Sequence, residues 1–204
     1  SVNITKVEVW VTNRNATTVD VRNIVALSDI GEGVSTNIGP ANVVPVPGSF
    51  LPKNDANDIS TILTINNPVR SIATVGNGLA PFSMQQGRDY SVLENAIKLR
   101  SDEFTLHPQL GYISLNRRLA DSDVLAVSFE YTISGDSNVY KVGEFTSDGI
   151  VAPENIVVKL LRSEIISTKI PMWNLMMKNI YSLGTYRMQQ DGFRLELLYA
   201  NDAT

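Results

Sequence analysis

The feature that most constrains the fold is a regular alternation of side chains in residues 125–133. Every second position holds a large apolar residue: Leu125, Val127, Phe129, Tyr131 and Ile133. Successive side chains of an extended backbone point to opposite faces, so a period of two is typical of a strand with one buried face. The segment is therefore predicted to form a half-buried β-strand.

This strand ends a longer run of short strands within residues 89–133. His107, Pro108 and Gly111 stand between two apolar segments, residues 104–106 and residues 112–115. Proline cannot continue a helix and glycine permits tight bends, so this run is predicted to be a turn between two strands. The region is expected to form an antiparallel meander.

Similar patterns predict further strands on both sides of the meander. They cover residues 4–11, 21–27, 140–145, 156–161 and 193–199. Residues 77–89 are predicted to be loop, as is a long Pro- and Gly-rich stretch at residues 28–57. A loop as long as residues 28–57 is expected to be either mobile or braced by something outside the chain.

Two short helices are predicted between these loops. Asp58 is expected to cap a helix at residues 59–64. Asn67 is the predicted N-cap of a second helix, which starts at Pro68 and ends before Gly76. With few helices and many strands, residues 1–204 are expected to form a single α+β domain. Its sheet is mainly antiparallel, meander- or sandwich-like, with a few short helices packed on it.

The last predicted helix offers a candidate docking surface. It begins at Pro171 and ends near Leu183, with Gly184 as its C-terminal cap. Apolar residues cover most of its circumference, which is typical of a helix buried on more than one side. One interpretation is a central core helix. The other is that one flank docks within a larger protein or on a partner, through Met172, Trp173, Met176 and Met177, because methionine adapts to varied surfaces.

The composition excludes several classes of chemistry. The chain has no cysteine and a single histidine, His107, so thiolate catalysis, cysteine-based metal sites and two-histidine metal sites are absent. No GxSxG or SxxK pattern occurs. The acidic run at residues 54–58 lacks the glycine and distal glutamate of an EF-hand loop. We therefore predict no catalytic, cofactor-binding or metal-binding residue and no small-molecule substrate.

Charge and hydropathy limit the partners further. The net charge of −4 and the scattered lysines and arginines argue against nucleic acid. The longest uncharged stretch, residues 33–52, contains four prolines and cannot be a spanning helix. The chain is expected not to span a membrane itself.

Several blocks resemble a known family. Residues 105–131 read TLHPQLGYISLNRRLADSDVLAVSFEY, which is similar to a signature of the SprA/Sov family of Bacteroidetes. Further blocks resemble the same family in the same order: ITKVEVWVTNRN, VRNIVALSDIGE, YKVGEF, VVKLLRS and PMWNLMMKNIYSLG. Residues 33–53 carry no such pattern, and the chain is far shorter than a whole member of the family.

The resemblance implies a function in transport. Members of the family are very large outer-membrane translocons of the type IX secretion system, first named for gliding motility. This chain would be a soluble, non-catalytic structural segment of such a protein, associated with the periplasmic or extracellular side of the outer membrane. Its partners would be other segments of the parent translocon and other secretion-system components. The alternative is a cell-surface module that binds carbohydrate or protein.

The absence of a nucleophile motif predicts that the chain has no enzymatic activity. A broad hydrolase screen is expected to show no turnover above a heat-denatured control. A glycosidase carboxylate pair has no local signature, so the screen should include glycosides. Turnover abolished by one substitution among Glu8, Glu94, Asp121, Asp123 and Glu130 would overturn this prediction.

Overall fold

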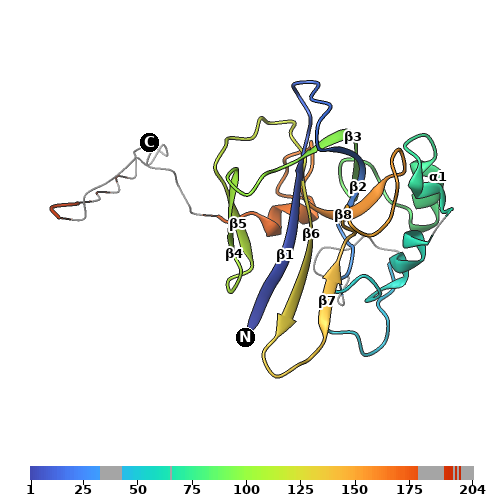
Figure 1. The fold of residues 1–204 in the computed structure, drawn as a ribbon, viewed down its shortest axis with the longest axis horizontal. Coiled ribbons are helices and arrows are strands. Elements are labelled where there is room, and N and C mark those ends of the chain that lie inside the picture. Colours follow the sequence, from blue (N-terminus) through green and yellow to red (C-terminus); the bar gives the residue numbers. More distant parts are fainter. Residues whose placement is uncertain (33–42, 65, 179–190, 195, 197, 199–204) are drawn as a thin grey trace, which may run out of the picture.

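Five strands close into a small barrel at the centre of the structure (Figure 1). The computed structural model describes residues 1–32, 43–64, 66–178, 191–194, 196 and 198. The barrel strands are β1 (Val2–Val11), β2 (Val21–Leu27), β3 (Tyr90–Lys98), β6 (Leu125–Ile133) and β8 (Ile156–Arg162). Their order is β1–β3–β2–β8–β6, and β6 pairs back with β1 to close the ring.

Most neighbouring strands are antiparallel, and only β2 and β8 run parallel among the described pairs. Strand β7 (Val139–Val142) continues the edge of β8, because the first part of β6 pairs with β8 and the second part with β7. The hairpin of β4 (Phe104–His107) and β5 (Tyr112–Leu115) forms a separate two-stranded sheet. The expected strand-rich, mainly antiparallel architecture is thus confirmed in outline, but a closed barrel replaces the sandwich-like arrangement.

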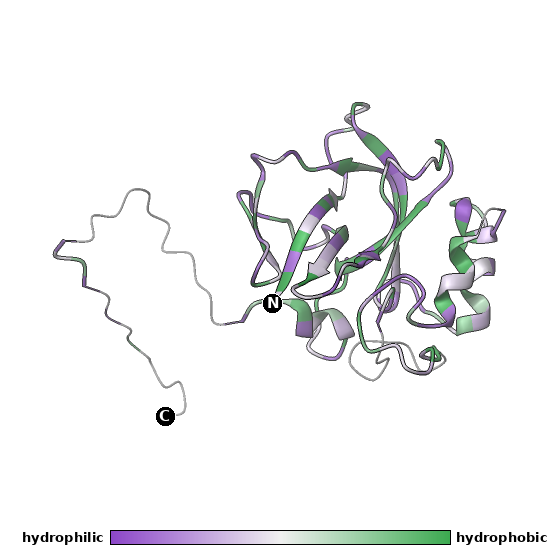
Figure 2. Cartoon of the chain, turned by 60° about the horizontal axis from the view of Figure 1, so that its bottom comes forward, coloured by the Kyte–Doolittle hydropathy of each residue, from purple (hydrophilic) through white to green (hydrophobic). Residues whose placement is uncertain are grey.

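Three apolar clusters hold this architecture together. The first fills the barrel with residues from all five strands, including Trp10, Ile24, Leu93, Ala126 and Val158. The second lies between the barrel wall and the helical segments, and the third lies under the β4–β5 hairpin. The flanking helical segment carries both hydrophobic and hydrophilic residues, as expected for a layer covering one side of the barrel (Figure 2).

Closure of the barrel explains why some strands are more buried than expected. The prediction of a half-buried strand at Leu125–Ile133 is wrong for part of its length, because Ala126 and Ser128 are fully buried inside the barrel. Trp10 is likewise fully buried, although its neighbours Val9 and Val11 face the other side of β1. The inner faces of these strands are covered in the barrel interior, and outer layers cover part of their outer faces.

The helical segment is more broken than the sequence indicates. It consists of the 3-10 helices η1 (Asp58–Leu63), η2 (Pro68–Arg70) and η3 (Ala80–Phe82) and the short α-helix α1 (Val75–Leu79). Asn67 caps η2 as predicted, with its side chain accepting a hydrogen bond from Val69 N. The cap of η1 is Asn57 rather than Asp58. Gly76 lies inside α1 instead of ending a helix, and residues 77–89 include η3.

The predicted helix from Pro171 is much shorter than expected. It is the 3-10 helix η4 (Pro171–Leu175), and Met176 is extended, with φ −79° and ψ 134°. Leu183 and Gly184 lie outside the described residues. Met172 is buried in the core, whereas Met176 and Met177 are partly exposed, so the apolar residues of this segment do not share one surface. The sequence pattern alone cannot distinguish this arrangement from a buried helix. Of the predicted strand at residues 193–199, the described residues lie in no strand and the others are outside the described part.

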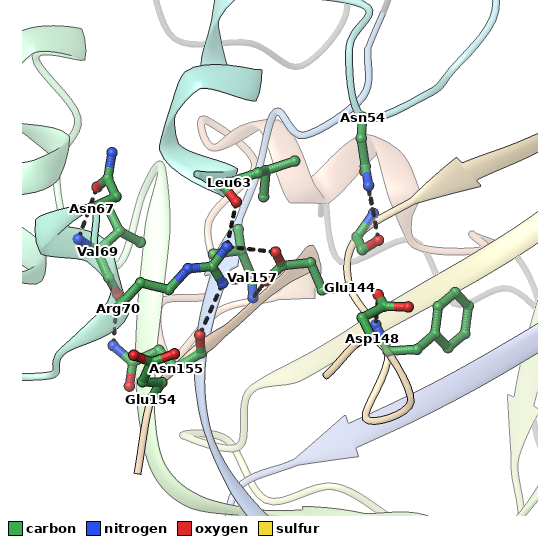
Figure 3. A network of polar contacts seen from close by, with 12 residues as sticks. Asn54, Leu63, Asn67, Val69, Arg70, Glu144, Asp148, Glu154, Asn155 and Val157 are labelled. Atoms are coloured by element: carbon green, nitrogen blue, oxygen red, sulfur yellow. Dashed lines mark hydrogen bonds and ion pairs between the residues drawn. The ribbon is translucent and has the colours of Figure 1, made fainter. Parts of the chain in front are cut away.

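The two ends of the 28–57 loop pack on the chain itself. Asp29 and Ile30 are fully buried, and Val43 is nearly so. Asn54 clamps Gly143, donating to its carbonyl at 3.0 Å and accepting from its N–H at 2.6 Å (Figure 3). Gly143 has φ +78°, and a Cβ there would lie 3.0 Å from the Cβ of Ser128. In these parts the chain itself braces the loop, which differs from both expected alternatives, a mobile loop and an external brace.

A buried ion pair joins the helical layer to the barrel (Figure 3). The Arg70 guanidinium donates two hydrogen bonds to the Glu144 carboxylate, at 2.6 and 2.7 Å. It also donates to the carbonyls of Leu63 and Asn155, while Glu144 accepts from Val157 N at 2.8 Å. Both side chains are less than a tenth exposed. The bidentate geometry satisfies both charges, so either one alone would be costly to bury.

This pair gives a prediction about stability. Arg70→Met leaves the Glu144 carboxylate buried without its counter-charge, so the free energy of unfolding is expected to fall by about 3–5 kcal/mol. The double variant Arg70→Met/Glu144→Gln keeps an acceptor for Val157 and removes the charge, so it should lose less. Chemical denaturation measures both. Equal losses in the two variants would show that packing, not the unpaired charge, dominates.

Candidate functional site

An apolar groove of about 690 Å³ lies on the outer face of the barrel beside the β4–β5 hairpin. Its lining is supplied by several elements. The barrel contributes Val2, Ile4, Val7, Leu125, Val127, Phe129, Tyr131, Leu161 and Arg162; the hairpin contributes Leu106, Gly111, Tyr112, Ile113, Ser114 and Leu115; the far side contributes Leu51, Pro52, Leu175, Met176 and Met177.

The barrel wall of the groove follows from strand periodicity. The lining residues of β6 alternate with residues whose side chains turn to the barrel interior, such as Ala126 and Ser128. On β1, Val7 lines the groove, while Trp10, three residues further on, is inside the barrel. The alternating apolar residues of β6 thus form a continuous apolar face, as predicted. That face lines the groove.

The far side of the groove is fixed by a tyrosine. The Tyr131 hydroxyl donates a hydrogen bond of 2.7 Å to the carbonyl of Pro52, which holds Leu51 and Pro52 against the barrel. Burial raises the pKa of Tyr131 to about 12, helped by the nearby Tyr140 and Glu32. The hydroxyl therefore stays protonated and keeps donating at any physiological pH.

The groove carries few polar groups and no carboxylate among its lining residues. Arg162 is its only charged lining residue, and its guanidinium is used by the carbonyls of Ala120, Asp121 and Asp123. The other titratable lining residues are Tyr131, whose hydroxyl donates to the Pro52 carbonyl, and Tyr112. An apolar cleft with these walls is suited to binding apolar side chains.

The structure separates the four candidate docking residues. Met172 is 2% exposed and belongs to the cluster inside the barrel. Trp173 is half-buried and shares a small crevice with Met172 and Met176. Met176 and Met177 line the groove and are 40% and 52% exposed. The core interpretation thus describes Met172, and the surface interpretation describes Met176 and Met177.

Residues considered for other chemistry have structural partners. The ring of His107 stacks on Tyr112 with centroids 4.2 Å apart. In the acidic run, Asn57 caps η1 and the Asp58 carboxylate accepts from Val44 N. Within the described residues, no group of three histidine, cysteine, aspartate or glutamate side chains is placed to hold a metal ion.

Sequence reasoning missed a buried polar cluster beneath the 28–57 loop. The Lys159 ammonium donates to the Ser28 carbonyl at 2.5 Å and to Glu32 Oε1 at 2.6 Å. Asp29 Oδ1 accepts from the Asn57 amide at 2.8 Å, and Asp29 Oδ2 has no partner among the described atoms. The signal was a lysine at an apolar position of the VVKLL strand. A strand buried on both faces can hold such a lysine only if carboxylates lie over it.

Burial shifts both charges in this cluster. It raises the pKa of Asp29 from 3.8 to about 7, although the nearby Lys159 partly opposes the rise. Burial also lowers the pKa of Lys159, against the pull of Glu32. The cluster ties the loop to β8, and its protonation is coupled to folding.

Comparison with known proteins adds no assignment. No protein-family model matches the chain, and no curated protein matches it. Of the helices in the described ranges, none has the length and apolar character needed to cross a membrane.

Asp29 gives a prediction about pH. The folded chain keeps the Asp29 proton up to about pH 7, whereas an ordinary aspartate releases it near pH 3.8. The unfolded state therefore binds fewer protons in this range, and stability from this group is lost as pH rises from about 4 to about 7. The free energy of unfolding of Asp29→Asn minus that of the parent chain should therefore be larger at pH 8 than at pH 4, by on the order of 2 kcal/mol.

Denaturation of the two chains at both pH values measures this difference. Asp136→Asn is the control, since the pKa of the Asp136 carboxyl is lowered by its hydrogen bond from Tyr140. This hydrogen bond favours the ionised carboxylate, so its contribution to stability is retained above pH 4. Asp136→Asn should therefore not gain stability at pH 8 relative to pH 4. A pH-independent difference for Asp29→Asn would contradict the prediction.

Proposed function

We propose that this chain is a non-catalytic structural segment of an outer-membrane protein translocon of the SprA/Sov kind, serving type IX secretion and gliding motility. The ordered sequence blocks that resemble this family support the class of protein. The apolar groove carries the role of the segment, because a structural segment needs a surface on which other parts of an assembly dock. The same proposal includes a single α+β domain and docking through residues at the groove.

Docking would use the exposed part of the groove. Met176 and Met177 extend from the end of η4 into it, and their unbranched side chains adapt to a partner surface. Trp173 stands beside them at the crevice, and Met172 anchors the segment in the barrel interior. The partners are other segments of the parent translocon or other secretion-system components, at the periplasmic or extracellular side of the outer membrane.

The alternative is a cell-surface binding module, and the groove favours its protein-binding form. Sugar hydroxyls need several hydrogen-bonding side chains, whereas the groove is mostly apolar and presents the hydroxyls of Ser114 and Tyr112 beside the already engaged Arg162 and Tyr131. An apolar lining of this kind recognises apolar side chains of a polypeptide. Carbohydrate binding therefore has less support than protein docking.

The proposal is tested by the double variant Met176→Ser/Met177→Ser. Both residues are exposed, so the melting temperature of the 204-residue chain should change by no more than about 2 °C. In the parent protein, the same variant should reduce secretion or assembly, because the docked segment loses apolar contact.

Met172→Ser is the matched control with the opposite expected result. It removes a side chain buried inside the barrel and should cost about 2–5 kcal/mol of stability in the chain. Unchanged secretion with Met176→Ser/Met177→Ser would reject docking at the groove. Secretion that does not depend on the parent protein at all would reject the translocon assignment.

A further inference from the structure

The β4–β5 hairpin presents an unpaired strand edge to the groove. Among the described strands β5 pairs only with β4. Strand β6 lines the groove with alternate residues, from Leu125 to Tyr131, as a sheet face does, but every residue of β5 lines it, from Tyr112 to Leu115, together with Gly111. Since side chains alternate along a strand, an unbroken run of lining residues means that the backbone edge borders the groove.

The hydrogen-bond pattern identifies the backbone groups at this edge. Asn116 N donates to Glu103 O at 2.9 Å, one position beyond the Phe104–Leu115 pair. Bonded and non-bonded pairs alternate in an antiparallel ladder, so Ser114 is bonded to β4 while Ile113 and Leu115 are not. The N–H and C=O of Ile113 and Leu115 therefore point away from β4, and none has a backbone partner within the described ranges.

Such an edge is open to another strand. Natural edges are usually protected by charged side chains, prolines or bulges. Tyr112–Leu115 carries no charge and no proline, and an apolar wall lies beside it. An extended segment that pairs with Ile113 and Leu115 would place every second side chain on that wall. The groove thus selects a strand with apolar residues at alternate positions and no charge on that face.

The same chain contains a segment of this chemistry. Residues 193–199 read FRLELLY, with Phe193, Leu195, Leu197 and Tyr199 at alternate positions and the charges of Arg194 and Glu196 between them. The described residues of this segment lie in no strand, and Phe193 and Leu198 are 50% and 94% exposed. The chain thus contains both a segment with the sequence pattern of a strand, residues 193–199, and a free strand edge on β5.

The course of the chain brings the two together. The described chain reaches the groove at Leu175–Met177, where η4 ends and Met176 is extended, and the 15 residues 178–192 separate it from Phe193. Fully extended, a connection of that length spans about 50 Å, which is ample for a return to β5.

We propose that residues 193–199 bind in the groove as a third strand on the free edge of β5. The inference rests on the proposed function in using the same groove as the docking surface, and it names the segment that docks there. Other edges are less suitable. The outer edge of β7 is already used, because Lys141 O accepts from Asn54 N at 2.8 Å, and β4 contributes only Leu106 to the groove.

Amide hydrogen exchange of the 204-residue chain, read residue by residue by NMR, tests the strand addition. If residues 193–199 pair with β5, the amides of Ile113 and Leu115 should exchange at least about 10-fold more slowly in the parent chain than in Leu195→Asp/Leu197→Asp. The Ser114 amide, which bonds to β4, is the internal reference and should be equally protected in both. Loss of protection at Ser114 would mean that the hairpin itself is disrupted, and then a chain ending at residue 190 replaces the variant.

Arg194→Glu/Glu196→Arg is the matched control, because it changes only the face directed away from the wall and keeps the net charge. It should retain the protection of Ile113 and Leu115. Equal exchange of these two amides in the parent chain and in Leu195→Asp/Leu197→Asp would overturn the proposal. Protection that rises with protein concentration would also overturn it, since the strand would then come from a second copy. Secretion assays with Met176→Ser/Met177→Ser address the proposed function separately.

Discussion

The pairing of β1 with β6 is the constraint on which the rest of the structure depends. It runs from Val2–Ile133 to Val11–Leu125, with one register shift, and joins the first strand of the chain to a strand more than a hundred residues later. Without it the sheet would be open and Trp10 would have no enclosed interior to fill. Closure gives every barrel strand an inner face packed in the interior, and outer layers cover parts of the outer surface: the helical segment on one side and the β4–β5 hairpin on the other.

Strand positions could be predicted from the sequence because a period of two is a local signal. The bounds of β2 and β6 agree with the predicted ranges, and the turn between β4 and β5 was marked by Pro108 and Gly111. Barrel closure could not be predicted, because it depends on pairing between distant segments. That non-local contact is also why Ala126 and Ser128, which look like the polar face of a strand, are buried.

The helical predictions failed for a different physical reason. Capping residues and apolar patterns indicate where a turn of helix starts, and Asn67 was found on that basis. They do not determine how far the helix extends, since 3-10 turns are stabilised by packing and by hydrogen bonds such as those of Arg70. For the candidate site, sequence reasoning found Met176 and Met177 but assigned them to the wrong element. The hairpin side of the groove was out of its reach, because nothing local in Tyr112–Leu115 says that its edge stays unpaired.

The buried charge of Lys159 and the apolar surface of the groove differ in whether the described residues satisfy them. Lys159 is held inside the structure by Ser28 and Glu32, so its charge is satisfied without any outside partner. The groove has no comparable internal solution within the described residues, because its apolar wall and the edge of β5 both remain uncovered there. An uncovered apolar edge is a template for indiscriminate pairing. A chain that keeps such an edge is under pressure to cover it with a specific strand, and the segment already tethered nearby has the highest effective concentration for that role.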